Sequence, residues 1–313
     1  MEVVKMDKDR VSAVLNEIRE LKRERNAVIL AHYYQTKEVK EVADFIGDSL
    51  ELSKKALRTN SDIIVFAGVS FMAEMAAVLN PEKIVLHPDI SAGCPLADFI
   101  TPGLVLKARK ENPGVPIVLY VNSPIEAKAL ADYVVTSSSA EKLIRKIGSK
   151  KVIFGPDKNL ADYVAKRSGV EVIPLPSNGH CYVHERLISR SVIEKIKSRH
   201  PKAKLLVHPE TSKEVRDMAD FIGSTSQMIK AIGELEGEEF IIGTEEGLSY
   251  DAKRNYPDKK VIPIRQAVCE DMKKITPEKI LSSLRTLSPK VIIDEEVAER
   301  ARRVIERSLQ IIG

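Results

Sequence analysis

Short, continuous apolar runs recur along the chain, and each has the length of a buried strand. In the first hundred residues these runs are Ala27–Ala31, Ile63–Ala67 and Lys83–Leu86. Runs without alternating polar positions are typical of parallel strands that are covered on both faces. They predict parallel sheets.

Amphipathic stretches separate these runs. Val39, Val42, Ala43 and Ile46 recur at helical spacing, so we expect one helix to continue through Ile46. Residues 48–57 and 71–79 also favour helices, and the segments 11–24, 104–111 and 191–199 each precede a strand. Strands that alternate with helices predict βαβ units and an α/β fold.

The pattern repeats with a period of 88 residues. The segments 29–49, 117–137 and 205–225 align without a gap, and Ala43-Asp44 returns at 131–132 and 219–220. Apolar runs recur likewise at 63–68, 152–155 and 240–243, and at 83–88, 171–176 and 260–264. Self-similarity of this kind indicates one structural unit present in three copies.

We therefore expect three pseudo-threefold-related, three-layer βαβ domains around a central cleft. Residues 1–100 and 101–188 would form the first two repeats. Residues 189–313 would form the third repeat with a C-terminal helical extension. Ligands of such folds lie beyond the carboxyl ends of the strands, so the cleft is the expected site.

The chain has three cysteines, Cys94, Cys181 and Cys269, at intervals of 87 and 88 residues. An odd count without a CxxC pair argues against a disulfide framework. Each cysteine follows the last strand of its repeat, so the three thiols would surround the axis. Three thiolates can hold three irons of a [4Fe–4S] cluster and leave the fourth open as a Lewis acid. The alternatives are a zinc site that combines Cys181 with His180 or His184, or simple burial of each cysteine.

Three further sets of polar residues recur at this period. His32, Tyr120 and His208 form one set after the first strand, and Tyr34, Asn122 and Glu210 form the next. Because the copies are polar yet dissimilar, we expect them to have diverged around an asymmetric substrate.

The third set carries hydroxyls, namely Ser49, Ser137, Ser224 and Thr225. We expect these residues at the starts of helices, where free N–H groups favour a carboxylate or phosphate. Ordinary helix capping is the alternative. The sequence has no GxGxxG or P-loop motif, so it does not indicate a nucleotide.

Charge and hydropathy exclude several classes of partner. The formal net charge is +4, with Lys and Arg dispersed among Asp and Glu, so no nucleic-acid surface is indicated. The most apolar stretch, Ile63–Leu79, contains Glu74 and does not fit a membrane span. Residues 1–10 do not fit a signal peptide. We expect a cytoplasmic protein.

Several short strings resemble the quinolinate synthase family from about residue 18 to the C-terminus. They are AHYYQ (31–35), ADFIGDS (43–49), GCP (93–95), LYVNS (119–123), IFGPD (153–157), NGHCYVH (178–184), VHPE (207–210), ADFIGST (219–225) and AVC (267–269). The resemblance includes all three cysteines and is therefore specific.

This resemblance implies an activity, a cofactor and partners. The family condenses iminoaspartate with dihydroxyacetone phosphate to quinolinate for NAD biosynthesis, with loss of phosphate and two waters. It uses one oxygen-sensitive [4Fe–4S] cluster per chain, at the centre of a triangle of three similar α/β domains. Functional coupling to an aspartate-oxidising enzyme is also expected.

The resemblance also implies roles for individual residues. Cys94, Cys181 and Cys269 would hold the cluster. Tyr34 would be a catalytic acid or base with His32 beside it, Tyr120 and Asn122 would position substrate, and His208 and Glu210 would transfer protons. Ser49, Ser137, Ser224 and Thr225 would hold carboxylate or phosphate.

Two other functions are compatible with the same residues. One is another [4Fe–4S] hydro-lyase of the aconitase type, which differs in its substrate and product. The other is a non-enzymatic zinc or redox-sensing protein, in which Tyr34 and Glu210 would be dispensable.

Overall fold

The computed structural model describes residues 8–313. Residues 1–7, on which much of the signal-peptide expectation depends, lie outside this range. The described residues form helices and three four-stranded sheets, and every pairing between their strands is parallel. The predicted α/β class is therefore confirmed.

The contacts within the chain divide it into two compact units. The first comprises residues up to Gly93 together with Glu270–Ile292, and the second comprises Cys94–Cys269 together with Ile293–Gly313. The first unit contains one sheet and the second contains two. The predicted domain boundaries near residues 100 and 188 remain a prediction.

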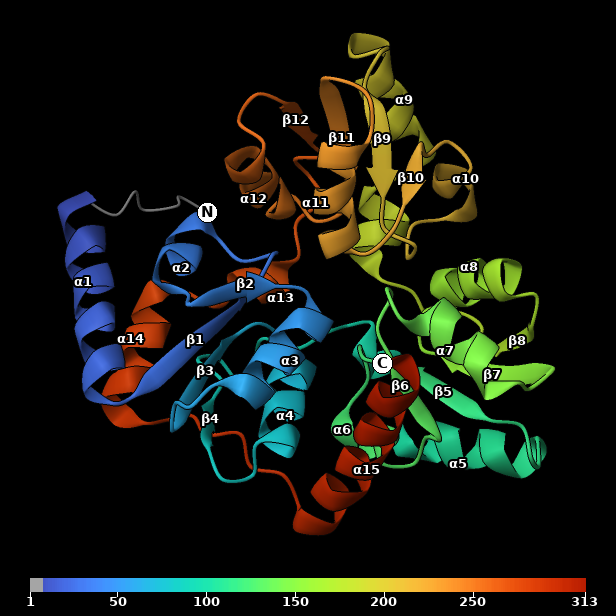
Figure 1. Cartoon of the computed structure of the whole chain (residues 1–313), viewed down its shortest axis with the longest axis horizontal. Coiled ribbons are helices and arrows are strands. Elements are labelled where there is room, and N and C mark those ends of the chain that lie inside the picture. Colours follow the sequence, from blue (N-terminus) through green and yellow to red (C-terminus); the bar gives the residue numbers. More distant parts are fainter. Residues whose placement is uncertain (1–7) are drawn as a thin grey trace. The chain divides into compact units, whose positions relative to one another are not determined.

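The first unit is built on a sheet of order β2-β1-β3-β4 (Figure 1). Its strands are β1 (Ala27–His32), β2 (Phe45–Gly47), β3 (Ile63–Ala67) and β4 (Ile84–Leu86). Its helices are α1 (Lys8–Glu24), α2 (Lys37–Val42), α3 (Ser49–Arg58), α4 (Ser70–Leu79), α13 (Glu270–Lys273) and α14 (Pro277–Thr286).

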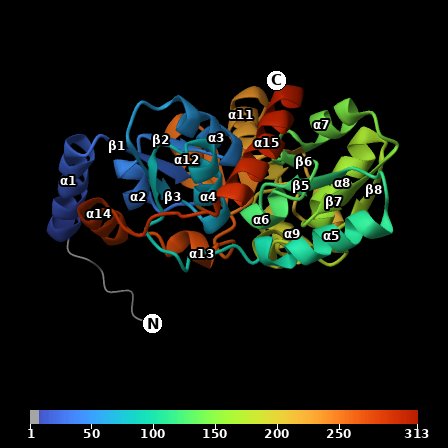
Figure 2. The same cartoon turned by 90° about the horizontal axis from the view of Figure 1, so that it is seen from below.

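The packing of this unit explains its apolar runs. Every residue of β1 and β3 is buried, as expected for strands covered on both faces. Helices α1 and α14 lie side by side in Figure 1 and Figure 2. Ile18 of α1 and Ile280 of α14 belong to one core with Ile29 and Val65. Helix α14, from near the C-terminus, thus packs into the same core as the first helix, α1.

The expectation of one helix through Ile46 is wrong. Helix α2 ends at Val42, and Phe45–Gly47 forms the edge strand β2, which pairs with β1. The Asp44 carboxylate accepts the N–H of Ile29 at 2.8 Å, and the N–H of Asp44 donates to the Ile29 carbonyl at 2.9 Å. This pair of hydrogen bonds ties the chain to β1 directly after α2, so the helical spacing spans two separate elements.

The second unit contains sheets of order β6-β5-β7-β8 and β10-β9-β11-β12. The strands of the former are β5 (Ile117–Tyr120), β6 (Tyr133–Val135), β7 (Lys151–Gly155) and β8 (Glu171–Pro174). Those of the latter are β9 (Lys204–Val207), β10 (Phe221–Ile222), β11 (Glu239–Gly243) and β12 (Lys260–Pro263).

The helices of this unit connect and cover these strands. They are η1 (Ala97–Phe99), α5 (Pro102–Glu111), α6 (Ile125–Lys128), α7 (Ala140–Ile147), α8 (Lys158–Ser168), η2 (Val183–Leu187), α9 (Arg190–Arg199), α10 (Lys213–Arg216), α11 (Thr225–Glu234), α12 (Leu248–Asn255) and α15 (Glu295–Ile312). The last helix, α15, packs against β6, α6 and α7. Among the described residues, none of the helices combines the length and apolar character that crossing a membrane requires.

An aspartate holds the edge strand in all three sheets. Asp44, Asp132 and Asp220 precede β2, β6 and β10, and each accepts a backbone N–H from the neighbouring strand at 2.8 Å. Each also pairs with a cation of an earlier helix, namely Lys22, Arg109 or Lys197. This shared contact gives the recurring Ala-Asp dipeptide a structural reason.

Candidate active site

All three cysteines lie in the second unit, each in a loop that follows a strand or precedes a short helix. Cys94 lies three residues before η1, Cys181 follows β8 and lies two residues before η2, and Cys269 follows β12. The residues keep some exposed surface. Nonetheless, burial raises the thiol pKa of Cys94 and Cys181. Glu210 and Cys269 raise both values further, and Cys94 also raises that of Cys181. The three thiols therefore lie close enough to influence one another electrostatically.

Backbone N–H groups partly offset this effect. Those of Leu96 and Ala97 point at the Cys94 sulfur, and that of His184 points at the Cys181 sulfur. Such donors favour the thiolate form, but burial outweighs them and keeps these two thiols protonated. A bound metal centre would supply the positive charge that buried thiolates need. Thiolate sets of this kind suit zinc or an iron–sulfur cluster.

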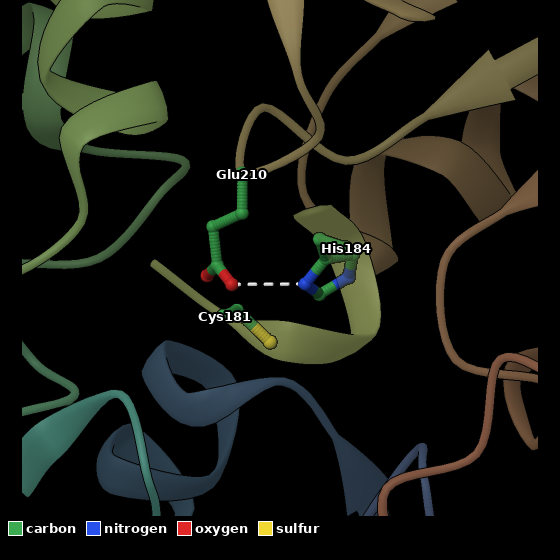
Figure 3. A group of neighbouring side chains, drawn as sticks. All are labelled: Cys181, His184 and Glu210. Atoms are coloured by element: carbon green, nitrogen blue, oxygen red, sulfur yellow. Dashed lines mark hydrogen bonds and ion pairs between the residues drawn. The ribbon is translucent and has the colours of Figure 1, made fainter. Parts of the chain in front are cut away.

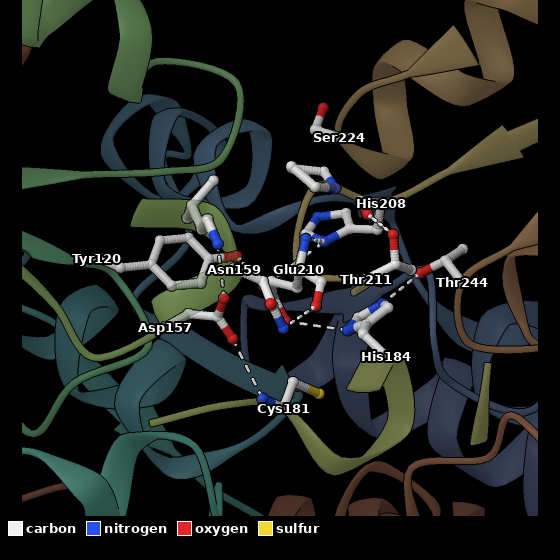
Figure 4. A network of polar contacts seen from close by, with 12 residues as sticks. Tyr120, Asp157, Asn159, Cys181, His184, His208, Glu210, Thr211, Ser224 and Thr244 are labelled. Atoms are coloured by element: carbon white, nitrogen blue, oxygen red, sulfur yellow. Dashed lines mark hydrogen bonds and ion pairs between the residues drawn. The ribbon is translucent and has the colours of Figure 1, made fainter. Parts of the chain in front are cut away.

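Glu210 joins the two sheets of the second unit (Figure 4). It follows β9, and its Oε1 accepts the hydroxyl of Tyr120, at the end of β5, at 2.6 Å. Its Oε2 lies 2.9 Å from His184 Nδ1. Burial alone would raise the carboxyl pKa, but the adjacent His208 and His184 and the hydrogen bonds from His184 and Tyr120 lower it to about 2. Glu210 is therefore a buried anion at neutral pH.

The anion determines the tautomer of His184. A carboxylate only accepts hydrogen bonds, so the His184 Nδ1 that contacts it must carry a proton. The other ring nitrogen, Nε2, lies 2.8 Å from Thr244 Oγ1 and accepts from that hydroxyl when the ring is neutral. Thr244, His184 and Glu210 thus form a continuous hydrogen-bonded chain.

His208 stacks on this chain. Its ring lies 4.7 Å from that of His184, and its Nδ1 accepts the N–H of Glu210 at 3.4 Å. Burial lowers the His208 pKa to about 3, so the ring is neutral at neutral pH and its proton is on Nε2. The predicted residues Tyr120, His208 and Glu210 therefore lie in one network.

The sequence analysis missed several members of this network. Asn159 donates to the Glu210 carbonyl at 3.0 Å, and Asp157 accepts the N–H of Cys181 at 3.1 Å. Thr244 was not singled out, and His184 was considered only as a zinc ligand. The 88-residue period was the available signal, because Asp157 falls on Glu245, which accepts the N–H of Cys269 at 3.2 Å.

Cys181, His184 and Glu210 also form a group that could hold a metal ion (Figure 3). One ligand atom from each lies within 4.8 Å of the others. Both ring nitrogens of His184 already have hydrogen-bonding partners, however. A metal bound by this group would therefore have to displace either Glu210 or Thr244 from the ring.

The other candidate residues of the second unit differ in whether they lie at the start of a helix. Ser224 caps α11, which begins at Thr225, and both residues are buried. Asn122 lies two residues after β5. Ser137 does not begin a helix as expected, since α7 begins at Ala140 after a turn in which Thr136 N–H donates to Ser139 Oγ. This turn separates Ser137 from the helix, so Ser137 is not at the start of α7.

His32, Tyr34 and Ser49 belong to the first unit, at the carboxyl edge of its sheet. His32 ends β1, and its Nδ1 accepts the N–H of Tyr34 at 3.2 Å, as His208 does from Glu210. The His32 and Tyr34 rings meet edge to face at 4.5 Å. Ser49 is the first residue of α3, which Asp48 caps. These three residues thus share one edge.

Comparison with known proteins covers nearly the whole chain. A family model described as "Quinolinate synthetase A protein" matches residues 16–310. The quinolinate synthase of Pyrococcus furiosus is 50% identical over 303 residues, which are 96% of this chain and 99% of that protein. That of Pyrococcus horikoshii is 50% identical over 298 residues, 95% of this chain and 98% of the relative. That of Thermotoga sp. (strain RQ2) is 46% identical over 300 residues, 96% and 100% of the two chains.

These matches include all three cysteine loops and both sheets that meet at Glu210. The chain therefore belongs to the quinolinate synthetase A protein family.

Proposed function

We propose that this chain is a quinolinate synthase, an enzyme of NAD biosynthesis. It would condense iminoaspartate with dihydroxyacetone phosphate and release phosphate and two waters. Family membership and the names of relatives that match it over almost their full length support this activity. The structural observation that carries the proposal is that the three thiols lie near one another, with the buried anion Glu210 close to Cys94 and Cys181.

Cys94, Cys181 and Cys269 would hold one [4Fe–4S] cluster per chain. Their chemistry fits, because the three thiols lie near one another, Cys94 and Cys181 are shielded from water, and backbone N–H groups point at the sulfurs of these two. A cluster with three protein ligands supplies one open iron as a Lewis acid for the departure of oxygen groups.

The residues around the thiols would move protons and orient substrate. Glu210 would take part in proton transfer, with the hydroxyl of Tyr120 and the ring of His184 as its hydrogen-bonding partners. His208 presents Nε2–H and would donate. Tyr34 with His32 would serve as a second acid–base pair, and Asn122 would position substrate. Ser49, Ser137, Ser224 and Thr225 would hold its carboxylate or phosphate groups.

The same proposal includes the arrangement of the repeats. The three sheets share one strand order, and each edge strand is held by an equivalent aspartate. These features support a triplicated fold, with repeats 1–100, 101–188 and 189–313 around a central cleft. We further propose a cytoplasmic enzyme with small-molecule substrates, coupled to an aspartate-oxidising enzyme and without nucleic-acid partners.

The test is anaerobic purification followed by metal and product analysis. We expect a brown protein with about four irons per chain that forms quinolinate from iminoaspartate and dihydroxyacetone phosphate. Cys181→Ser should abolish turnover and lower the iron content. Zinc in place of iron would contradict the proposal, and an iron–sulfur protein that makes another dehydration product would indicate an aconitase-type hydro-lyase.

A further inference from the structure

Two buried acidic side chains contact two of the cysteine loops. Asp157 follows β7 and Glu245 follows β11, each two residues after the strand ends. They are 88 residues apart, as are Cys181 and Cys269. Both side chains are fully buried, at 0% exposure. Neither residue belongs to the predicted catalytic or ligand set.

Each carboxylate divides its two oxygens in the same way. One oxygen holds the backbone that follows it, since Asp157 Oδ1 accepts from Leu160 N at 2.8 Å and Glu245 Oε2 from Gly247 N at 2.7 Å. The other oxygen accepts the N–H of a cysteine, at 3.1 Å for Cys181 and 3.2 Å for Cys269. Figure 4 shows the contact of Asp157 with Cys181.

A backbone hydrogen bond accompanies each carboxylate. The next residue along the chain donates its N–H to the carbonyl two residues before the cysteine. Lys158 donates to Gly179, and Glu246 to Ala267, both at 2.8 Å. In the first repeat Ser70 donates to Ala92, two residues before Cys94, at 2.9 Å. The place of the carboxylate is there taken by Val69, which caps α4 without a side-chain hydrogen bond.

We propose that Asp157 and Glu245 are positioning residues that fix the loops of Cys181 and Cys269 for a metal centre. The proposal rests on the proposed function, since the thiols are taken as its ligands. Without the carboxylate, a buried cysteine N–H loses its acceptor and the loop gains freedom. Groups that orient metal ligands typically change metal affinity by about 10- to 100-fold when removed.

The experiment compares iron release from Asp157→Ala, Glu245→Ala and the parent chain. Each protein is purified and reconstituted anaerobically, and transfer of iron to a ferrous chelator is followed by absorbance. We expect both variants to release iron about 10-fold faster or more. Asp157→Asn and Glu245→Gln retain one acceptor oxygen and should lie between the parent and the alanine variants.

Asp220→Ala is the matched control. Asp220 also accepts a backbone N–H, from Leu205 at 2.8 Å, but it holds an edge strand rather than a cysteine. The Asp220→Ala variant should release iron at the parent rate. This should hold even if its thermal unfolding midpoint, measured without metal, is lowered as much as that of Asp157→Ala. Parent-like release from Asp157→Ala and Glu245→Ala, or equally fast release from Asp220→Ala, would overturn the proposal. A parent chain that binds no iron would instead overturn the proposed function.

Discussion

Glu210 keeps its charge in a place where burial opposes it. The hydroxyl of Tyr120 and the ring of His184 both donate to it, so the cost of desolvation is offset by two short hydrogen bonds at 2.6 and 2.9 Å. The carboxylate is therefore held as a fixed negative charge near Cys94 and Cys181, and it raises the pKa of both thiols.

Glu210→Gln should separate proton transfer from metal binding. The variant keeps the volume of the side chain but removes the acceptor charge, so we expect kcat to fall about 10²- to 10⁴-fold. Iron content should remain that of the parent. Glu239→Gln is the control, because Glu239 pairs with His200 and Lys260 and is not part of the site. Loss of iron from Glu210→Gln would assign Glu210 a structural role instead.

At this scale the sequence predicts residues whose chemistry is rare and whose spacing is regular. The cysteines, His208 and Glu210 stand out for both reasons. Asp157 and Asn159 do not, because they act on backbone atoms of Cys181 and Glu210 that are distant in sequence. Carboxylates and amides are common on surfaces, so residue type does not distinguish these two from their solvated counterparts, and only Asp157 has a recurring carboxyl residue, Glu245, at the 88-residue period.

At the scale of elements, the short edge strands were the least predictable. Strands β2, β6 and β10 have two or three residues, too few to show a period of their own. In the first repeat, Ile46 of β2 continues the helical spacing of the apolar residues in the preceding helix α2. The buried central strands were predictable, because their runs are longer and have no polar positions.

Asp132→Ala tests what defines an edge strand. It removes the acceptor of the Ile117 N–H and the ion pair with Arg109, at 2.8 and 3.1 Å. We expect the free energy of unfolding to fall by about 1–3 kcal/mol, measured by urea denaturation. Glu111→Ala removes only an exposed pair with Lys107 at 3.8 Å and should cost less than about 0.5 kcal/mol. Equal effects would show that the aspartate acts only as a surface charge.

At the scale of the whole molecule, each compact unit is completed by a segment that is distant in sequence. In the second unit α15 covers the edge strand β6, where Ser308 Oγ accepts the N–H of Val134 at 2.8 Å (Figure 1). An uncovered edge would offer unpaired backbone groups to other chains. Sequence predicted the helix but not its partner, because amphipathicity does not specify which surface the apolar face covers.

Ile305→Ala should therefore destabilise a sheet that lies more than a hundred residues earlier in the chain. Ile305 is buried on α15 at 2% exposure, so we expect a loss of about 2–5 kcal/mol and a lower midpoint of guanidinium denaturation. Arg303→Ala, on the exposed face of the same helix, should leave the midpoint nearly unchanged. A small effect of Ile305→Ala would mean that the second unit folds without α15.

The backbone bonds from Ser70, Lys158 and Glu246 to the cysteine loops have a consequence for how such a chain diverges. They join main-chain atoms alone, so almost any residue, except proline, preserves them. Three different residues occupy the donor positions in this one chain. Side chains at the donor positions can thus be substituted while the backbone bonds keep the three cysteine loops in place. The rest of each loop can therefore change in sequence during evolution.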